Sequence, residues 1–338
     1  MLETEQAGAE TSASTDDVLV VEDLKVYYDS VRGDVKAVDG VSFTLKQGER
    51  LALVGESGSG KSTMATALMG MTEAPGRVRG GRAYLNGQDL LAMNRSEMRM
   101  TRLSDIALVP QAALNSLNPV IRVERQIIDG IIDHAEDQKP TKEALDERVQ
   151  ELLSTVGLPS SAARMFPHEL SGGMKQRVAM AIATSLSPKL IIADEPTSAL
   201  DVVVQRQIME TLGQLQEGLS ASVILIGHDM GLIAQFADTI GIMYAGKLVE
   251  FGPVEAIFEN PQHPYTQALI QSLPSFKHRL QSSGIPGMPP TLANLPSGCS
   301  FNPRCTFVMD TCRVNEPVMR NVGPGQLASC HLFEGDKE

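Results

Sequence analysis

Apolar and polar residues along the first part of the chain alternate in patterns typical of strands and helices. Residues 18–28 (VLVVEDLKVYY) and 35–45 (VKAVDGVSFTL) are rich in β-branched side chains in partly alternating order, with a turn-like DSVRGD between them. This pattern predicts two paired strands. The apolar run ERLALVG, residues 49–55, ends in glycine and precedes the helical pattern KSTMATALMGM, residues 61–71. These two segments predict a buried strand, a loop and a helix.

The rest of the chain shows helical, strand and then loop-like patterns. Helix formers dominate from about residue 112 to 186. Within this region four apolar residues recur at helical spacing: Leu145, Val149, Leu152 and Leu153. Short apolar runs typical of buried strands return at residues 190–194, 222–227 and 239–246. The alternation predicts an α/β core with a helical insertion. Prolines become frequent from residue 253 onward, which predicts a loop-rich C-terminal region.

Composition narrows the classes of protein that fit this pattern. The chain has 338 residues, of which 42% are hydrophobic and 21% charged, as in an ordinary globular protein. Its formal net charge of −12 argues against a nucleic-acid-binding surface. No apolar run approaches the roughly 18 residues that a membrane span needs. Residues 1–17 carry five acidic residues and lack the apolar core of a signal peptide, so we expect a disordered tail on a cytoplasmic protein.

The segment GESGSGKS fits the pattern G-x-x-x-x-G-K-[ST] of a phosphate-binding loop and lies between the predicted strand and helix. Glycines let the loop turn its N–H groups toward phosphate oxygens, and the helix N-terminus adds its positive dipole. We expect Lys61 to reach the β- and γ-phosphates, Ser62 to bind Mg²⁺ and Thr63 to support the α-phosphate. The predicted nucleotide-binding residues here are Gly55, Glu56, Ser57, Gly58, Ser59, Gly60, Lys61, Ser62 and Thr63. The alternative is a plain Gly/Ser-rich turn that opens a helix.

Two carboxylates and a histidine follow later apolar strands. Asp194 ends the run KLIIAD and is predicted to hold Mg²⁺ through water, while Glu195 is predicted to act as a general base on the attacking water. His228 follows SVILIG and is predicted to take part in catalysis by contacting the γ-phosphate and the attacking water. Alone, an apolar run ending in two acids is an ordinary strand end, and a lone histidine is an ordinary surface residue.

The stretch LSGGMKQR, residues 170–177, together with these segments, resembles the ATPase subunits of ABC transporters. The resemblance assigns Gln111 to the Q-loop, with a role at Mg²⁺ and in catalysis, and Tyr28 to stacking on adenine, although Tyr27 lies beside it. The matching signature residues are Ser171, Gly172, Gly173, Lys175 and Gln176. The matching D-loop residues are Ser198, Ala199, Leu200 and Asp201.

The family's architecture implies an α/β fold: a P-loop ABC ATPase with a RecA-like core, an antiparallel β subdomain, a helical signature subdomain and, in this chain, a loop-rich C-terminal cysteine metal module. We expect a tail over residues 1–17, an ABC ATPase domain over 18–252 with its helical subdomain at about 112–186, and a C-terminal extension over 253–338. The family also implies that Ser171 and its neighbours, at a helix start, meet the γ-phosphate of ATP bound by a second, head-to-tail ATPase subunit.

The C-terminal stretches NPQHPYTQALIQSLP, IPGMPP and GCSFNPRC resemble the subfamily that powers oligopeptide, dipeptide and nickel importers, and so does QAALNSLNP, which begins at Gln111. The subfamily implies a second and different ATPase subunit, two transmembrane permease subunits and an extracytoplasmic solute-binding protein. It places the chain at the cytoplasmic face of the cell membrane, with Gln111 near the coupling helices of the permeases.

All four cysteines lie in the C-terminal extension: Cys299, Cys305, Cys312 and Cys330. Clustered cysteines in a reducing compartment more often hold metal than form disulfides. Four thiolates satisfy either Zn²⁺ or an iron–sulfur cluster, and the subfamily pattern C-x-F-x-P-R-C implies a [4Fe-4S] cluster. Zinc and plain thiols remain the alternatives.

The resemblance predicts an ATPase that drives solute import, with peptides as the first candidate solute and nickel complexes or oligosaccharides as rivals. A soluble nucleic-acid-associated ABC ATPase is the alternative from a different class, and the acidic balance of the chain opposes it. An exporter ATPase is a third possibility, which predicts a fused membrane domain or a different C-terminal region.

Overall fold

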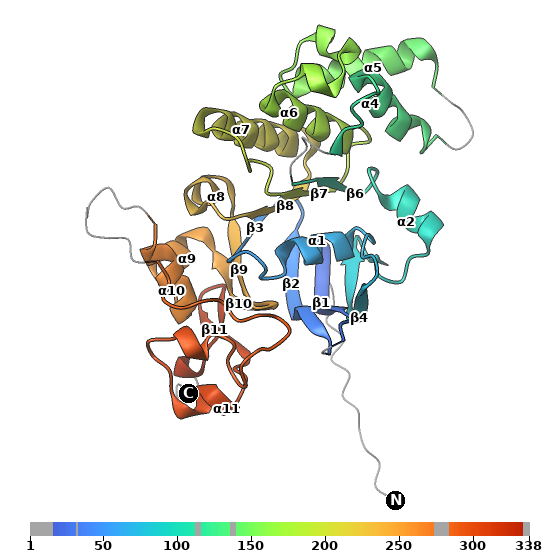
Figure 1. The fold of residues 1–338 in the computed structure, drawn as a ribbon. Helices are drawn as coiled ribbons and strands as arrows, with labels where there is room; N and C mark the ends of the chain where they lie inside the picture. Colours follow the sequence, from blue (N-terminus) through green and yellow to red (C-terminus); the bar gives the residue numbers. More distant parts are fainter. Residues whose placement is uncertain (1–15, 32, 112–115, 136–139, 274–283, 334–338) are drawn as a thin grey trace, which may run out of the picture.

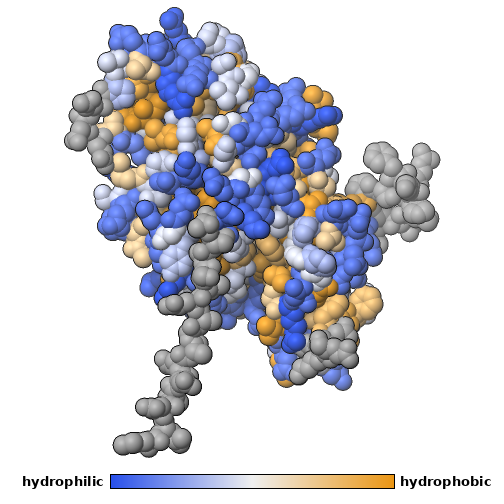
Figure 2. Space-filling view, turned by 180° about the vertical axis from the view of Figure 1, so that it is seen from behind, coloured by the Kyte–Doolittle hydropathy of each residue, from blue (hydrophilic) through white to orange (hydrophobic). Residues whose placement is uncertain are grey.

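The computed structural model describes residues 16–31, 33–111, 116–135, 140–273 and 284–333 (Figure 1). The predicted tail therefore lies outside the described residues except for Asp16 and Asp17, and QAALNSLNP lies partly outside them. None of the helices in the described ranges is both long and apolar enough to cross a membrane. Seen from behind, hydrophilic side chains cover much of the surface and apolar ones lie between them (Figure 2).

An antiparallel sheet forms the N-terminal part of the fold. Its strand order is β2-β1-β4-β5. The strands are β1 (Asp17–Tyr28), β2 (Val35–Lys46), β4 (Gly76–Leu85) and β5 (Gln88–Asp89). The predicted pairing of the first two strands is confirmed, because Val20 faces Thr44 and Val26 faces Val38 in an antiparallel register.

The second sheet has eight strands in the order β11-β12-β10-β9-β3-β8-β7-β6. Its parallel strands are β3 (Arg50–Val54), β6 (Ile106–Val109), β7 (Leu190–Asp194), β8 (Ser222–Gly227) and β9 (Thr239–Tyr244). Its antiparallel strands are β10 (Lys247–Pro253), β11 (Met319–Gly323) and β12 (Gln326–Ser329). Parallel strands end at the same edge of a sheet, and ligands of open α/β sheets bind outside that edge.

Some helices lie beside the main sheet, and others form a separate layer above it in Figure 1. The upper layer contains α4 (Val123–Ile132), α5 (Lys142–Thr155) and α6 (Gly172–Ala183). The other α-helices are α1 (Lys61–Leu68), α2 (Arg95–Thr101), α7 (Val202–Leu219), α8 (Met230–Phe236), α9 (Val254–Glu259), α10 (Pro264–Gln271) and α11 (Asp310–Val314). Short 3-10 helices are η1 (Ser160–Arg164), η2 (Pro167–Glu169), η3 (Asn302–Arg304) and η4 (His331–Phe333). The helix predicted around Leu145 and Val149 is confirmed, because α5 buries both side chains.

The central strands are buried on both faces, which explains their continuous apolar sequences. In β3, Ala52 and Val54 join one hydrophobic core while Leu51 and Leu53 join the other. The same alternation divides β7 between the two cores. The resulting rigid sheet fixes the positions of the loops at its carboxyl edge.

The prediction of a cysteine metal module is wrong. All four cysteines lie in the described residues, and no group of three or more His, Cys, Asp or Glu side chains there is placed to hold a metal ion. Burial raises the pKa of Cys299 and Cys330 to about 11, which favours neutral thiols over the thiolates that bind metals. Neither an iron–sulfur cluster nor zinc is therefore supported. The extension instead adds β12 and β11 to the main sheet and packs Phe301 into its core.

Neutral, part-buried thiols should react slowly with alkylating agents. At pH 8 a thiol with a pKa of about 11 is a thiolate only about one time in a thousand. We expect iodoacetamide to label Cys299 and Cys330 far more slowly in the folded chain than in urea, as followed by mass spectrometry of peptides. Labelling at the unfolded rate would contradict the burial of these thiols.

Candidate nucleotide-binding and hydrolysis site

The predicted phosphate loop connects β3 to α1 and requires glycine at two close approaches. Gly55 has φ +156°, and a Cβ there would lie 2.1 Å from the Met243 carbonyl oxygen. Gly60 has φ +103°, and a Cβ there would lie 2.0 Å from the Ala37 carbonyl oxygen. Gly60 is also the N-cap of α1 and makes no side-chain capping bond to the first turn. The loop therefore presents backbone and a helix N-terminus, which suits an anion.

Lys61 bridges the two ends of this loop. Its Nζ donates to the carbonyl oxygens of Gly55 at 2.8 Å and Glu56 at 3.0 Å, and to the Ser59 hydroxyl at 3.0 Å. Burial lowers the pKa of Lys61, while Glu195, Asp194 and Glu56 favour its charged form. The ammonium is thus held inside the curl of the loop.

Ser62 and Asp194 meet where α1 begins and β7 ends. The Ser62 hydroxyl donates to Asp194 Oδ1 at 3.0 Å. Burial raises the pKa of the Asp194 carboxyl, and the bond from Ser62 opposes that shift. A hydroxyl and a carboxylate side by side are oxygen ligands of the kind that Mg²⁺ prefers, so these residues fit the ion.

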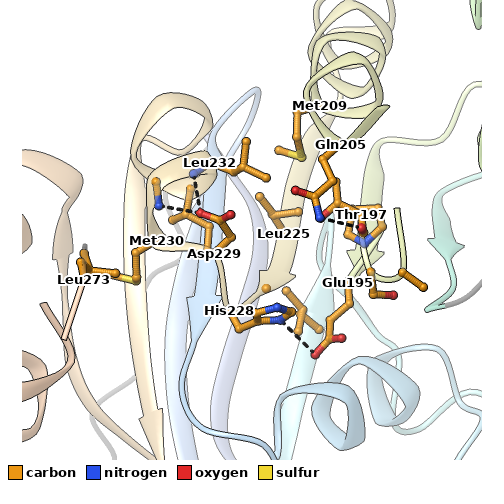
Figure 3. Close-up of a pocket in the computed structure, with 17 residues that line it drawn as sticks. Glu195, Thr197, Gln205, Met209, Leu225, His228, Asp229, Met230, Leu232 and Leu273 are labelled. Atoms are coloured by element: carbon orange, nitrogen blue, oxygen red, sulfur yellow. Dashed lines mark hydrogen bonds and ion pairs between the residues drawn. The ribbon is translucent and has the colours of Figure 1, made fainter. Parts of the chain in front are cut away.

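Glu195 lies beside both Gln111 and His228. Gln111 Nε2 donates to Glu195 Oε2 at 2.7 Å. His228 Nδ1 lies 3.9 Å from Glu195 Oε1, as Figure 3 shows. Glu195 has φ +42°, an unusual conformation for a residue with a side chain, and its N–H donates to the Ile226 carbonyl of β8. A cavity of about 560 Å³ opens beside Glu195 and His228. Three residues that are far apart in sequence thus converge at the ends of β6, β7 and β8.

The predicted signature residues lie elsewhere, at the start of α6. Ser171 is exposed at the N-cap, and its hydroxyl accepts a bond from the Met174 N–H at 3.3 Å. Gly172, Gly173 and Lys175 are partly exposed, whereas Gln176 is buried. Figure 1 shows α6 in the helical layer, apart from α1, so this chain does not bring its signature to its own phosphate loop.

The predicted D-loop connects β7 to α7. Asp201 is exposed at the N-cap of α7 and accepts a bond from the Val204 N–H at 3.0 Å. Ala199 is exposed with φ +62°, and the Ser198 N–H donates to the Glu195 carbonyl. Leu200 is part-buried against the core. The D-loop backbone is therefore tied directly to Glu195.

The two tyrosines at the end of β1 have different surroundings. The Tyr27 hydroxyl donates to Asp39 Oδ1. Burial, and then this bond, raise the pKa of the phenol. Tyr28 is half-buried, and its ring lies against Gly76, where a Cβ would come within 2.8 Å of it. Tyr27 is thus hydrogen-bonded to β2, and Tyr28 is the better candidate to stack on adenine.

Comparison with known proteins identifies the family. Residues 38–198 match the family model described as ABC transporter, and residues 249–312 match that of the oligopeptide/dipeptide transporter C-terminal region. The chain is 44% identical over 319 residues to the dipeptide transport ATP-binding protein DppD of Escherichia coli, covering 93% of this chain and 96% of that protein. The chain belongs to the ABC transporter family.

Other relatives agree. The ABC transporter subunit is 43% identical over 320 residues to the oligopeptide transport ATP-binding protein OppD of Salmonella typhimurium, covering 93% of each chain. Its fold matches the dimeric structure of an ATP-binding cassette in a post-hydrolysis state bound to ADP and Pi, with a TM-score of 0.63 and 27% identity. That match covers 70% of this chain and 98% of the other.

Motif spacing did not predict two contacts of this ABC transporter subunit, and both hold Glu56 of the phosphate loop. The Tyr265 hydroxyl accepts a bond from the Glu56 N–H at 2.9 Å. Arg304 donates to both carboxylate oxygens of Glu56, at 2.6 and 3.0 Å. Tyr265 and Arg304 lie in NPQHPYT and FNPRC, so the only sequence signal for them was their place in the two C-terminal stretches.

Proposed function

We propose that this chain is the ATP-hydrolysing subunit of a transporter that imports dipeptides or oligopeptides. The observation that carries the proposal is the match of one chain to both the ABC transporter and the oligopeptide/dipeptide transporter C-terminal families. The relatives named as dipeptide and oligopeptide transport ATP-binding proteins match it over nearly their whole length, which supports the same activity here.

In this proposal ATP occupies the phosphate loop. Backbone N–H groups of residues 55–60 and the ammonium of Lys61 bind the phosphates, Thr63 supports the α-phosphate, and the ring of Tyr28 stacks on adenine. Ser62, Gln111 and Asp194 are the candidates to hold Mg²⁺, which neutralises charge on the β- and γ-phosphates when bound.

Glu195 acts as the general base in the proposed reaction. Its carboxylate accepts a proton from water as the water oxygen bonds to the γ-phosphorus and the bond from that phosphorus to the β–γ bridging oxygen breaks, giving ADP and phosphate. Gln111, which donates to Oε2, and His228, near Oε1, hold the carboxylate in place. His228 also contacts the γ-phosphate in this scheme.

A second ATPase subunit completes each site in the proposed complex. The signature at Ser171 lies in the helical layer, so it needs a partner whose bound ATP it can reach. The start of α7 supports such an interface, because Asp201 is exposed and Val202 and Val203 are apolar and 80% and 68% exposed. We propose that the partner is a different ATPase chain.

The proposed complex also contains two permease subunits and an extracytoplasmic solute-binding protein, with this chain peripheral on the cytoplasmic side of the membrane. Gln111, exposed beside the catalytic carboxylate, lies where a permease segment would influence hydrolysis.

Solute-stimulated ATP hydrolysis distinguishes peptides from the rival solutes. The assembled transporter is measured with its binding protein and, in turn, dipeptides, oligopeptides, a nickel complex and an oligosaccharide. We expect peptides to stimulate hydrolysis by several-fold over the binding protein alone. Stimulation by the nickel complex or the oligosaccharide, without a response to peptides, would overturn the proposed solute class.

A further inference from the structure

We propose that Arg304 of the C-terminal extension is a positioning residue of the nucleotide site, which neutralises Glu56 and keeps the phosphate loop able to bind ATP. The inference rests on the proposed function, because it concerns the same site. It gives the extension a direct part in nucleotide binding.

Glu56 is fixed at three points within the phosphate loop. Its N–H donates to the Tyr265 hydroxyl at 2.9 Å, and its carbonyl oxygen accepts from Lys61 Nζ at 3.0 Å. Its carboxylate receives the bidentate pair from Arg304. Its carbonyl oxygen also accepts from the Ser59 N–H at 3.1 Å. Tyr265 and Arg304 both belong to the C-terminal extension, so the conformation of the loop depends on residues more than 200 positions away in sequence.

The guanidinium of Arg304 is itself held rigidly. Its side chain is 4% exposed, compared with 27% for Glu56. Nε donates to the Pro286 carbonyl at 2.9 Å, and one terminal nitrogen also reaches the Tyr244 hydroxyl at 3.3 Å. A planar donor fixed on several sides matches a carboxylate in a way that lysine cannot.

An aromatic cluster places this pair beside the loop. Tyr244 ends β9, next to the Met243 carbonyl that closely approaches Gly55. The ring centroid of Tyr244 lies 4.6 Å from that of Tyr265 and 5.2 Å from that of Phe301. Phe301 precedes Arg304 in the extension and is buried, so the extension is packed against the strand that supports the phosphate loop.

Charge gives the pair its effect on ATP. Glu56 belongs to the loop that binds phosphates, and an unpaired carboxylate there would repel them. Arg304 cancels that charge from outside the loop.

The test compares variants of the full chain by calorimetric titration with ATP. Removing the cation should weaken binding, so we expect Arg304→Gln to lower ATP affinity by roughly tenfold to fiftyfold. Glu56→Gln leaves the positive charge of Arg304 uncompensated beside the loop and should raise affinity, and the double variant Glu56→Gln/Arg304→Gln, which removes both charges, should return close to wild type. Arg313→Gln, which changes an exposed arginine of the same extension, is the matched control and should bind as wild type.

The opposite signs of the two single variants separate positioning from a purely structural role. If both weaken ATP binding equally and the double variant does not recover, Arg304 only fastens the extension and the inference is overturned. The inference is also overturned if Arg304→Gln binds ATP with wild-type affinity while Lys61→Ala binds ATP more weakly. The proposed function stands in that case. Failure of the wild-type chain to bind ATP would instead overturn the proposed function.

Discussion

Replacing Glu195 with glutamine is expected to reduce ATP hydrolysis by the assembled transporter by at least about a hundredfold while ATP still binds. Glutamine has nearly the same shape and keeps an oxygen to accept the bond from Gln111, but its amide cannot take a proton from water. The variant should therefore hold ATP between the two ATPase subunits. Phosphate release measures hydrolysis, and retention of labelled ATP measures the trapped state.

A matched control for this variant is Glu210→Gln. Glu210 is an exposed carboxylate on α7 that pairs with Arg206, so its loss should leave turnover unchanged. Normal turnover of Glu195→Gln in the assembled transporter would refute the assignment of Glu195 as the base.

Replacing Lys61 with alanine is expected to weaken ATP binding itself, on the order of a hundredfold, because bonds to charged groups contribute about 1.5–3 kcal/mol each. The variant also loses the three bonds by which Nζ holds the loop closed. Calorimetric titration of the full chain with ATP measures the change. Lys142→Ala, at an exposed position on α5, is the control, and an unchanged affinity of Lys61→Ala would count against the phosphate-loop assignment.

The central part of the site could be predicted from the sequence because its polar side chains lie at the ends of apolar strands. Asp194, Glu195 and His228 each follow such a run, and parallel strands bring their carboxyl ends to one edge of the sheet. The motif order and the resemblance then assigned the roles. The structure places Gln111 and His228 beside Glu195 at this edge.

The C-terminal extension was predicted less well, for two physical reasons. The metal prediction failed because the spacing of the four cysteines, Cys299, Cys305, Cys312 and Cys330, contains no information on their burial. Burial raises the pKa of Cys299 and Cys330 and so keeps these thiols neutral. The pair between Arg304 and Glu56 spans 248 positions, and neither residue shows a periodicity that points to the other. Strands β11 and β12 are short and only partly buried, so their apolar patterns are weak.

Uptake of a radiolabelled dipeptide into proteoliposomes shows directly whether this chain couples ATP hydrolysis to peptide import. The vesicles contain this chain, its partner ATPase and the permease subunits, with ATP in the lumen and the binding protein outside. We expect uptake to require both ATP and the binding protein and to be lost in Glu195→Gln. Dipeptide uptake that does not depend on ATP, or ATP hydrolysis without any uptake, would contradict this coupling.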